Sequence, residues 1–202
     1  VVAGTRFAVP MDDANGDVPI DSFKENFKGV LSFIGIDQQT GGMDLSFQIE
    51  APGINFDLSH AGKKKSGDWF FFSCYNSEKA NTLLEVNASQ NDKDFIMAVN
   101  WKKAAELVKA GKGRKVTTEY AHNTWDESTH SATSTMKKEV VVLSVEDMKD
   151  AMFMIPCPKS PHGCDVDPTG EYIIGSGKLA ALIPVFSFDK MIKAIADKNF
   201  AG

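Results

Sequence analysis

The chain has 202 residues, 43% of them hydrophobic and 24% charged, an ordinary composition for a globular protein that is long enough to bury a core. Its 22 basic and 27 acidic residues give a formal net charge of -5, so it offers no basic surface for a nucleic-acid backbone. No apolar run approaches the roughly 18 consecutive residues of a membrane-spanning helix, so a membrane is also a poor partner.

The two ends of the sequence predict a piece of something longer. Residues 1–4 have neither an initiator methionine nor the charged and apolar regions of a secretory signal. Residues 197–202 have no feature that would mark a natural terminus.

Short strands dominate the predicted secondary structure. Residues 43–50 alternate apolar and polar side chains, which places Met43, Leu45, Phe47 and Ile49 on the buried face of a half-exposed antiparallel strand. Further strands are expected at residues 6–9, 30–36, 69–73, 95–99, 140–143, 152–155, 172–174 and 182–186, with turn residues between them. The pattern favours an all-β array of sheets.

Two helices are expected among the strands, each as an insertion on the rim of the sheets. Residues 101–111 have an apolar face, with Gly111 as the stop, and residues 187–196 repeat the pattern. The two faces consist of Trp101, Ala104, Ala105 and Val108, and of Phe188, Met191, Ile192 and Ile195.

The three cysteines, Cys74, Cys157 and Cys164, form no CxxC pair, so neither a disulfide framework nor a zinc ribbon is indicated. Buried thiols are the simpler expectation.

The chemistry of the chain concentrates in residues 156–174. Three prolines keep the backbone extended, and His162 is therefore presented by a rigid segment. The turn at residues 167–170 has proline second and glycine fourth, and predicts a β-hairpin. A histidine held in this way suits a metal, although the residues alone favour a hydrogen-bonded structural histidine.

A second constellation joins Tyr75, Glu78 and Asp94. Carboxylate, carbonyl and phenolic oxygens are the hard ligands that calcium prefers, so these residues predict a calcium site. Two polar turns are the alternative interpretation. Asp57 lies at the end of residues 53–57, which are compatible with a surface turn. The basic run at residues 63–65 is compatible with a solvated loop or with a docking surface.

Three long blocks, residues 74–95, 119–140 and 157–179, closely resemble the N-terminal domain of the nitrous oxide reductase family, in the same order and at similar spacing. The resemblance extends over nearly the whole chain. It implies that residues 1–202 are a fragment of a seven-bladed β-propeller. It also implies that further blades and a C-terminal cupredoxin domain with a dinuclear copper centre lie outside this sequence.

The resemblance also assigns the candidate residues. His162, in a Pro-His-Gly motif, matches one of seven histidines that hold a tetranuclear copper–sulfide centre in that family, and Asp57 matches an aspartate near those histidines. His60, His122 and His130 match no ligand motif and are expected on solvated loops.

The family's calcium ligands match Tyr75, Glu78 and Asp94. A fourth position falls on Ser160, where other members carry asparagine.

By resemblance, the complete protein is a periplasmic copper enzyme of denitrification that reduces nitrous oxide to dinitrogen and water. Its electrons come from a c-type cytochrome or a cupredoxin, through the dinuclear copper of the partner subunit in a homodimer. The fragment alone is expected to be inactive. A non-catalytic propeller that binds a partner protein is the alternative, and six further histidines in the flanking sequence would distinguish the enzyme from it.

Overall fold

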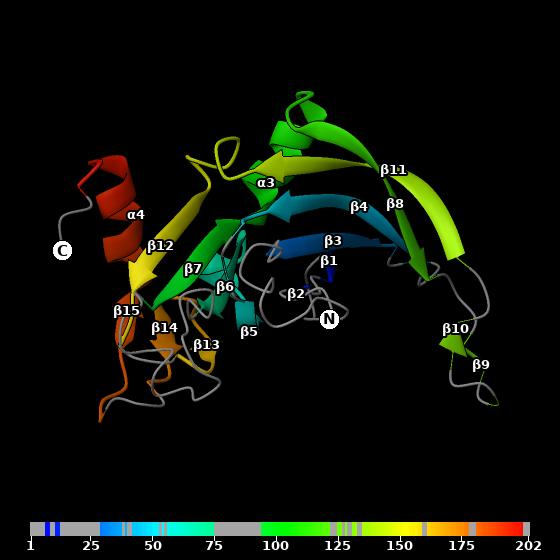
Figure 1. The fold of residues 1–202 in the computed structure, drawn as a ribbon. Coiled ribbons are helices and arrows are strands. Elements are labelled where there is room, and N and C mark those ends of the chain that lie inside the picture. The colour runs from blue at the N-terminus through cyan, green and yellow to red at the C-terminus, as the bar shows by residue number, and fades with distance from the viewer. Residues whose placement is uncertain are drawn as a thin grey trace, which may run out of the picture.

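The computed structural model describes residues 7–8, 11–12, 29–37, 39, 42–52, 54, 56–74, 94–121, 125–126, 128, 131–132, 135–158, 161–177 and 181–199 (Figure 1). Strands dominate these ranges, which confirms the all-β class. The strands are β1 (Phe7–Ala8), β2 (Met11–Asp12), β3 (Val30–Ile36), β4 (Met43–Glu50), β5 (Phe56–Ala61), β6 (Trp69–Cys74), β7 (Phe95–Asn100), β8 (Arg114–Ala121), β9 (Trp125–Asp126), β10 (Ser131–Ala132), β11 (Thr135–Ser144), β12 (Met152–Pro156), β13 (Cys164–Val166), β14 (Tyr172–Gly175) and β15 (Val185–Ser187). The helices are α3 (Trp101–Lys109), α4 (Phe188–Ala196) and the 3-10 turn η1 (Lys64–Ser66).

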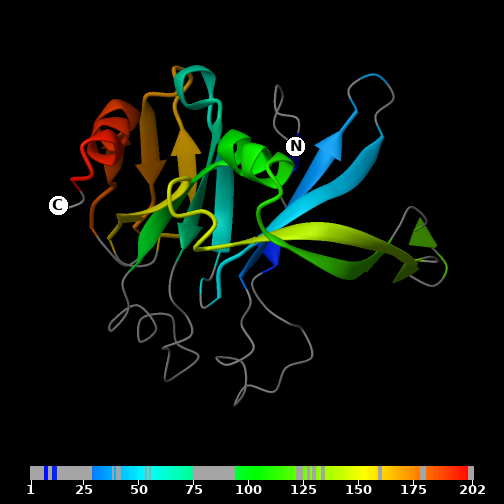
Figure 2. The same ribbon diagram turned by 90° about the horizontal axis from the view of Figure 1, so that it is seen from above.

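Three of the sheets are stacked face to face. The first sheet has the order β1-β3-β4-β11-β8, with β2 also on β3; the second has the order β12-β7-β6-β5, and the third β13-β14-β15. A short ribbon of β9 and β10 lies apart from them. Seen from above, the sheets follow one another from α4 at one end to the β8 and β11 hairpin at the other (Figure 2). The described residues contain no closed ring of sheets, so the propeller remains a prediction.

The inner strands of the second sheet, β6 and β7, are buried on both faces. Along β6, Phe70 and Phe72 pack into a core shared with the first sheet, whereas Trp69 and Phe71 pack into a core shared with the third. Successive side chains of a strand point to opposite faces, so both faces of β6 are apolar and every residue of β6 is buried. This two-sided burial requires an apolar layer on each side, which the first sheet with α3 and the third sheet with α4 provide.

The first sheet is mixed. Leu45, Phe47 and Ile49 of β4 are buried as predicted, while the side chain of Met43 lies outside the described residues. The strand pairs with β3 in antiparallel and with β11 in parallel, with Val141 opposite Phe47. The prediction of an antiparallel strand is therefore confirmed for the pairing with β3, whereas the parallel pairing with β11 was not predicted. The parallel contact arises because the chain leaves the second sheet after β7 and returns to the first as the β8 and β11 hairpin.

Both helices begin at side-chain caps. Asn100 accepts a hydrogen bond from the Lys103 amide (2.9 Å) at the start of α3, and Gly111, with φ of 77°, follows its end as predicted. Ser187 accepts from the Lys190 amide (3.2 Å) at the start of α4. The predicted apolar face of α3 packs on the core, but in α4 the inclusion of Ile192 was wrong, because it is 36% exposed.

The predicted hairpin at residues 164–175 is confirmed. Strands β13 and β14 pair in antiparallel around the turn that begins at Asp167. The Asp167 carboxylate accepts hydrogen bonds from the Tyr172 amide (2.8 Å) and from the Thr169 amide and hydroxyl, and these bonds lower its pKa to about 2.

The loop between β5 and β6 fastens the second sheet to the third. Lys63 Nζ donates to the Val166 carbonyl (2.7 Å), and Lys65 Nζ forms ion pairs with Glu171 (2.7 Å) and Asp189, which raise the pKa of Lys65. Lys64 and Lys65 are exposed, as the solvated-loop interpretation predicts, but Lys63 and Lys65 also bind partners across the two sheets, which that interpretation did not include. The partners of these lysines lie on β13, just before β14 and on α4. They are distant from residues 63–65 in the sequence, so no local pattern predicted these contacts.

We expect Gly170→Ala to lower the free energy of unfolding much more than Gly111→Ala. Both glycines have a left-handed φ, 78° and 77°, so each substitution carries strain of about 1–2 kcal/mol. A Cβ on Gly170 would also lie 1.8 Å from the Lys63 carbonyl oxygen, whereas one on Gly111 meets nothing within 4 Å. Overpacking adds about 1–3 kcal/mol, so the loss is about 2–5 kcal/mol at Gly170. Urea denaturation followed by tryptophan fluorescence measures both; equal losses would contradict the tight contact of this turn with the lysine loop.

Candidate functional site

The predicted metal ligand and the predicted aspartate lie together. The Nδ1 atom of His162 is 2.5 Å from Oδ2 of Asp57, although the two residues are 105 positions apart. The His162 side chain is 52% exposed and that of Asp57 only 16%. Because a carboxylate only accepts hydrogen bonds, the imidazole proton lies on Nδ1. In the neutral ring Nε2 is then the atom with a free lone pair, and it makes no hydrogen bond within the described part of the chain.

The neighbours of His162 hold it in place. Pro161 is buried, and Gly163 has φ of 146°, a conformation that residues with a side chain rarely adopt. The Gly163 carbonyl accepts a hydrogen bond from the Ser176 amide (3.0 Å), which ties it to the segment after β14. The imidazole is therefore presented from a fixed backbone at the entrance to β13.

A second histidine–aspartate pair joins the same two strands. His60 lies in β5, with Nδ1 2.7 Å from the Ala61 carbonyl oxygen and Nε2 3.7 Å from Oδ1 of Asp165 in β13. The expectation of a solvated loop histidine was wrong, because the side chain of His60 is only 22% exposed. His122 and His130 lie outside the described residues.

Asp94 lies at the start of β7 and is only 6% exposed. Its carbonyl accepts a hydrogen bond from the Cys157 amide (3.0 Å), so it lies beside the segment that leads to His162. The other predicted calcium ligands, Tyr75, Glu78 and Ser160, lie outside the described residues. Among the residues with described positions, no three His, Cys, Asp or Glu side chains are grouped in a way that could hold a metal ion.

The three thiols are not paired in disulfides. Burial raises the pKa of Cys164 to about 12, and burial together with the charge of Asp94 raises that of Cys157 to about 11. Both are therefore protonated at neutral pH. Cys74 and Cys164 are buried as expected, but Cys157 is only half-buried.

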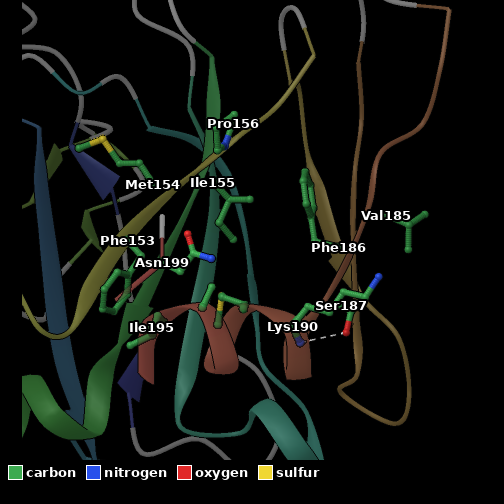
Figure 3. Close-up of a pocket in the computed structure, with 12 residues that line it drawn as sticks. Phe153, Met154, Ile155, Pro156, Val185, Phe186, Ser187, Lys190, Ile195 and Asn199 are labelled. Atoms are coloured by element: carbon green, nitrogen blue, oxygen red, sulfur yellow. Dashed lines mark hydrogen bonds between the residues drawn. The ribbon is translucent and has the colours of Figure 1, made fainter. Parts of the chain in front are cut away.

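A separate pocket of about 370 Å³ lies between β12, β15 and α4. Figure 3 shows Phe153 and Ile155 on one wall, Phe186 on another and Ile195 on the helix. None of the site residues predicted from the sequence lines this pocket.

Comparison with known proteins agrees with the resemblance in the three sequence blocks. No family model matches the chain. It is 31% identical over 200 residues to a nitrous-oxide reductase of Pseudomonas fluorescens, and 28% identical over 200 residues to one of Stutzerimonas stutzeri. Each alignment covers 98% of the chain and 27% of the relative, so the chain spans about a quarter of the length of these relatives. The similarity to nitrous-oxide reductases, proposed from the sequence blocks, is thereby confirmed.

No helix in the described ranges is long and apolar enough to cross a membrane.

We expect both native thiols to react slowly with an alkylating reagent, and Cys164 to react more slowly than Cys157. Thiolate is the reactive form, and with pKa values of about 11 and about 12 the thiolate fraction at Cys164 is roughly tenfold lower. Labelling with iodoacetamide between pH 7 and pH 10, read by mass spectrometry, should show both rates rising about tenfold per pH unit. The urea-unfolded chain is the control; equal rates for Cys164 in the native and unfolded chains would contradict its burial.

Proposed function

We propose that the chain is part of the β-propeller of a nitrous oxide reductase, and that His162 binds the copper–sulfide cluster that reduces nitrous oxide. The observation that carries the proposal is the contact between His162 Nδ1 and Asp57, in a chain similar over 98% of its length to proteins with that name.

The ring of His162 has the arrangement of a metal ligand. Metal-binding histidines generally donate their second ring N–H to a carboxylate, a carbonyl or water, which fixes the tautomer and makes the ligand more basic. Asp57 provides that acceptor at 2.5 Å, and imidazole suits copper. One ligand cannot hold a four-copper cluster, so the remaining histidines must come from sequence outside this chain.

The arrangement of the sheets supports the propeller. Strands β5, β6, β7 and β12 form an antiparallel sheet in which chain neighbours are also spatial neighbours, apart from the insertion between β7 and β12. In a propeller, four-stranded sheets surround a central channel. The first strand of the second sheet, β5, lies against the first strand of the third, β13, and these strands hold Asp57 and present His162. The pair thus lies where successive sheets meet.

The tasks of this chain's own residues are binding and orientation. His162 offers Nε2 to copper, Asp57 holds the Nδ1 proton, and Pro161 and Gly163 fix the backbone between them and the sheet. When bound, the copper cluster supplies the two electrons that, with two protons, convert nitrous oxide to dinitrogen and water. In the complete protein these electrons would arrive from a c-type cytochrome or cupredoxin through the dinuclear copper of a partner subunit, in the periplasm.

We also propose that Asp94 binds calcium together with Tyr75, Glu78 and Ser160. Asp94 is nearly buried, and its carbonyl binds the Cys157 amide, five residues before His162. A calcium ion bound there would tie residues 75–93 to the segment that presents His162.

In the full-length protein, His162→Ala should lower copper at the catalytic centre and abolish nitrous oxide reduction, while the spectrum of the separate dinuclear centre stays unchanged. Copper analysis, absorption spectra and nitrous oxide consumption with a reduced dye measure these effects. His60→Ala is the matched control, because it removes the other histidine that bridges β5 and β13. Full activity of His162→Ala would refute the proposed ligand, and equal losses in both variants would mean that His162 acts only on the fold.

Glu78→Gln and Asp94→Asn should weaken calcium retention before they lower the copper content, because each removes a charged oxygen ligand. Titration with a calcium chelator, followed by analysis of both metals, measures the order of loss. Asp68→Asn, which removes an exposed partner of Lys102, should change neither metal. Unchanged calcium retention in both test variants would refute the proposed calcium site.

A further inference from the structure

Strand β5 contains a β-bulge at Asp57. In its pairing with β6, Phe56 lies opposite Cys74, and Ser59 lies opposite Phe72. Asp57 and Leu58 therefore face the single residue Ser73. Such a bulge adds one residue to one strand and changes where the following side chains point.

The burial pattern shows what the extra residue achieves. Phe56 and Ala61 both pack into the core shared with the first sheet, although residues five apart in a regular strand face opposite sides. In the same way, Asp57 and His60 are three apart, yet both pair with residues around β13, namely His162 and Asp165. Without the bulge, the side chains of Asp57 and His60 would point to opposite faces of the sheet, and the two contacts could not both form.

The hydroxyl of Ser73 holds the bulge. Ser73 is 0% exposed, and its Oγ accepts a hydrogen bond from the Leu58 amide (3.1 Å) and donates one to the Leu58 carbonyl (3.3 Å). These bonds replace the ladder bonds that the bulge interrupts, so both main-chain polar groups of Leu58 have a partner.

The Leu58 carbonyl of the bulge also contacts the strand that follows His162. The Cys164 thiol lies 3.8 Å from the Leu58 carbonyl oxygen and donates to the Phe71 carbonyl (3.3 Å). Leu58 is thus held between β6 and β13, directly after Asp57 in the chain.

We propose that Ser73 is a positioning residue of the metal site. Its hydroxyl fixes the β5 bulge, the bulge directs the Asp57 carboxylate at Nδ1 of His162, and Asp57 in turn directs Nε2 of His162 at copper. The inference rests on the proposed function of His162, and Ser73 itself touches neither metal nor substrate.

The test is Ser73→Ala in the copper-loaded full-length protein, with Ser66→Ala as the matched control. Ser66 is also 0% exposed, and its Oγ makes the same two kinds of bond, to the Lys63 amide (3.3 Å) and carbonyl (3.3 Å), at the other end of the β5 and β6 hairpin. Copper loss from the catalytic centre to a chelator is followed by the absorption of the cluster, and the Tm of each variant is recorded.

We expect Ser73→Ala to accelerate copper loss on the order of three- to tenfold, below the 10- to 100-fold typical when a ligand's direct partner is removed. Ser66→Ala should lower the Tm comparably and leave the rate unchanged. In an Asp57→Asn background, Ser73→Ala should add nothing, because both act through one carboxylate. Equal rates in the two serine variants, or additive effects with Asp57→Asn, would overturn the inference.

A crystal structure of metal-free Ser73→Ala separates this inference from the proposed function. An intact Asp57–His162 contact overturns the role of Ser73, whatever the copper does. A broken contact with unchanged copper retention instead overturns His162 as the ligand. If the alanine variant does not fold, Ser73→Cys keeps the shape of the side chain, slightly enlarged, with a much weaker hydrogen-bonding group, and should give a copper-loss rate between those of the native protein and Asp57→Asn.

Discussion

The inner strands β6 and β7 of the second sheet have no face for solvent, and the remaining architecture depends on that constraint. Phe70 and Phe72 require a cover on one side, and Trp69 and Phe71 require one on the other. Burying a large apolar side chain is worth about 1.5–3 kcal/mol, so leaving either face of this sheet open would cost many times that amount. The first and third sheets supply the two covers. The stack brings β5 and β13 together, and with them Asp57 and His162.

The joint between the second and third sheets is fastened in two chemically different ways. In the β5–β6 loop, Lys63 and Lys65 reach across to the third sheet and α4, and Gly170 leaves no room for a side chain against Lys63. Within β5, two histidine–aspartate pairs cross to β13 and its approach. The candidate metal ligand is therefore part of the same contact that aligns the two sheets. The control variants at His60 and Ser66 lie in this same contact, so they separate an effect on the alignment of the two sheets from an effect on the His162–Asp57 pair.

The sequence predicted the parts of the fold that have a local signal. Strand β4 has strict alternation, α3 has an apolar face and a glycine stop, and the 164–175 hairpin has its turn residues, and all three formed where expected. Strands β5 and β8 were missed because their polar side chains, such as Asp57 and His60 or Arg114 and Lys115, interrupt the apolar pattern. The parallel pairing of β4 with β11 was missed because it depends on a hairpin that returns from elsewhere in the chain.

The site shows the same division. His162 and Asp57 were each identified from the sequence. No local pattern indicates that Ser73 lies opposite Asp57 and Leu58, since Ser73 is only a small residue that follows four aromatic ones. The most direct test of the central claim is the anomalous scattering of copper in crystals of the full-length protein. We predict a copper peak at bonding distance, about 2 Å, from Nε2 of His162, with Nδ1 still bound to Asp57. A cluster in the same protein with no copper near His162 would contradict the claim.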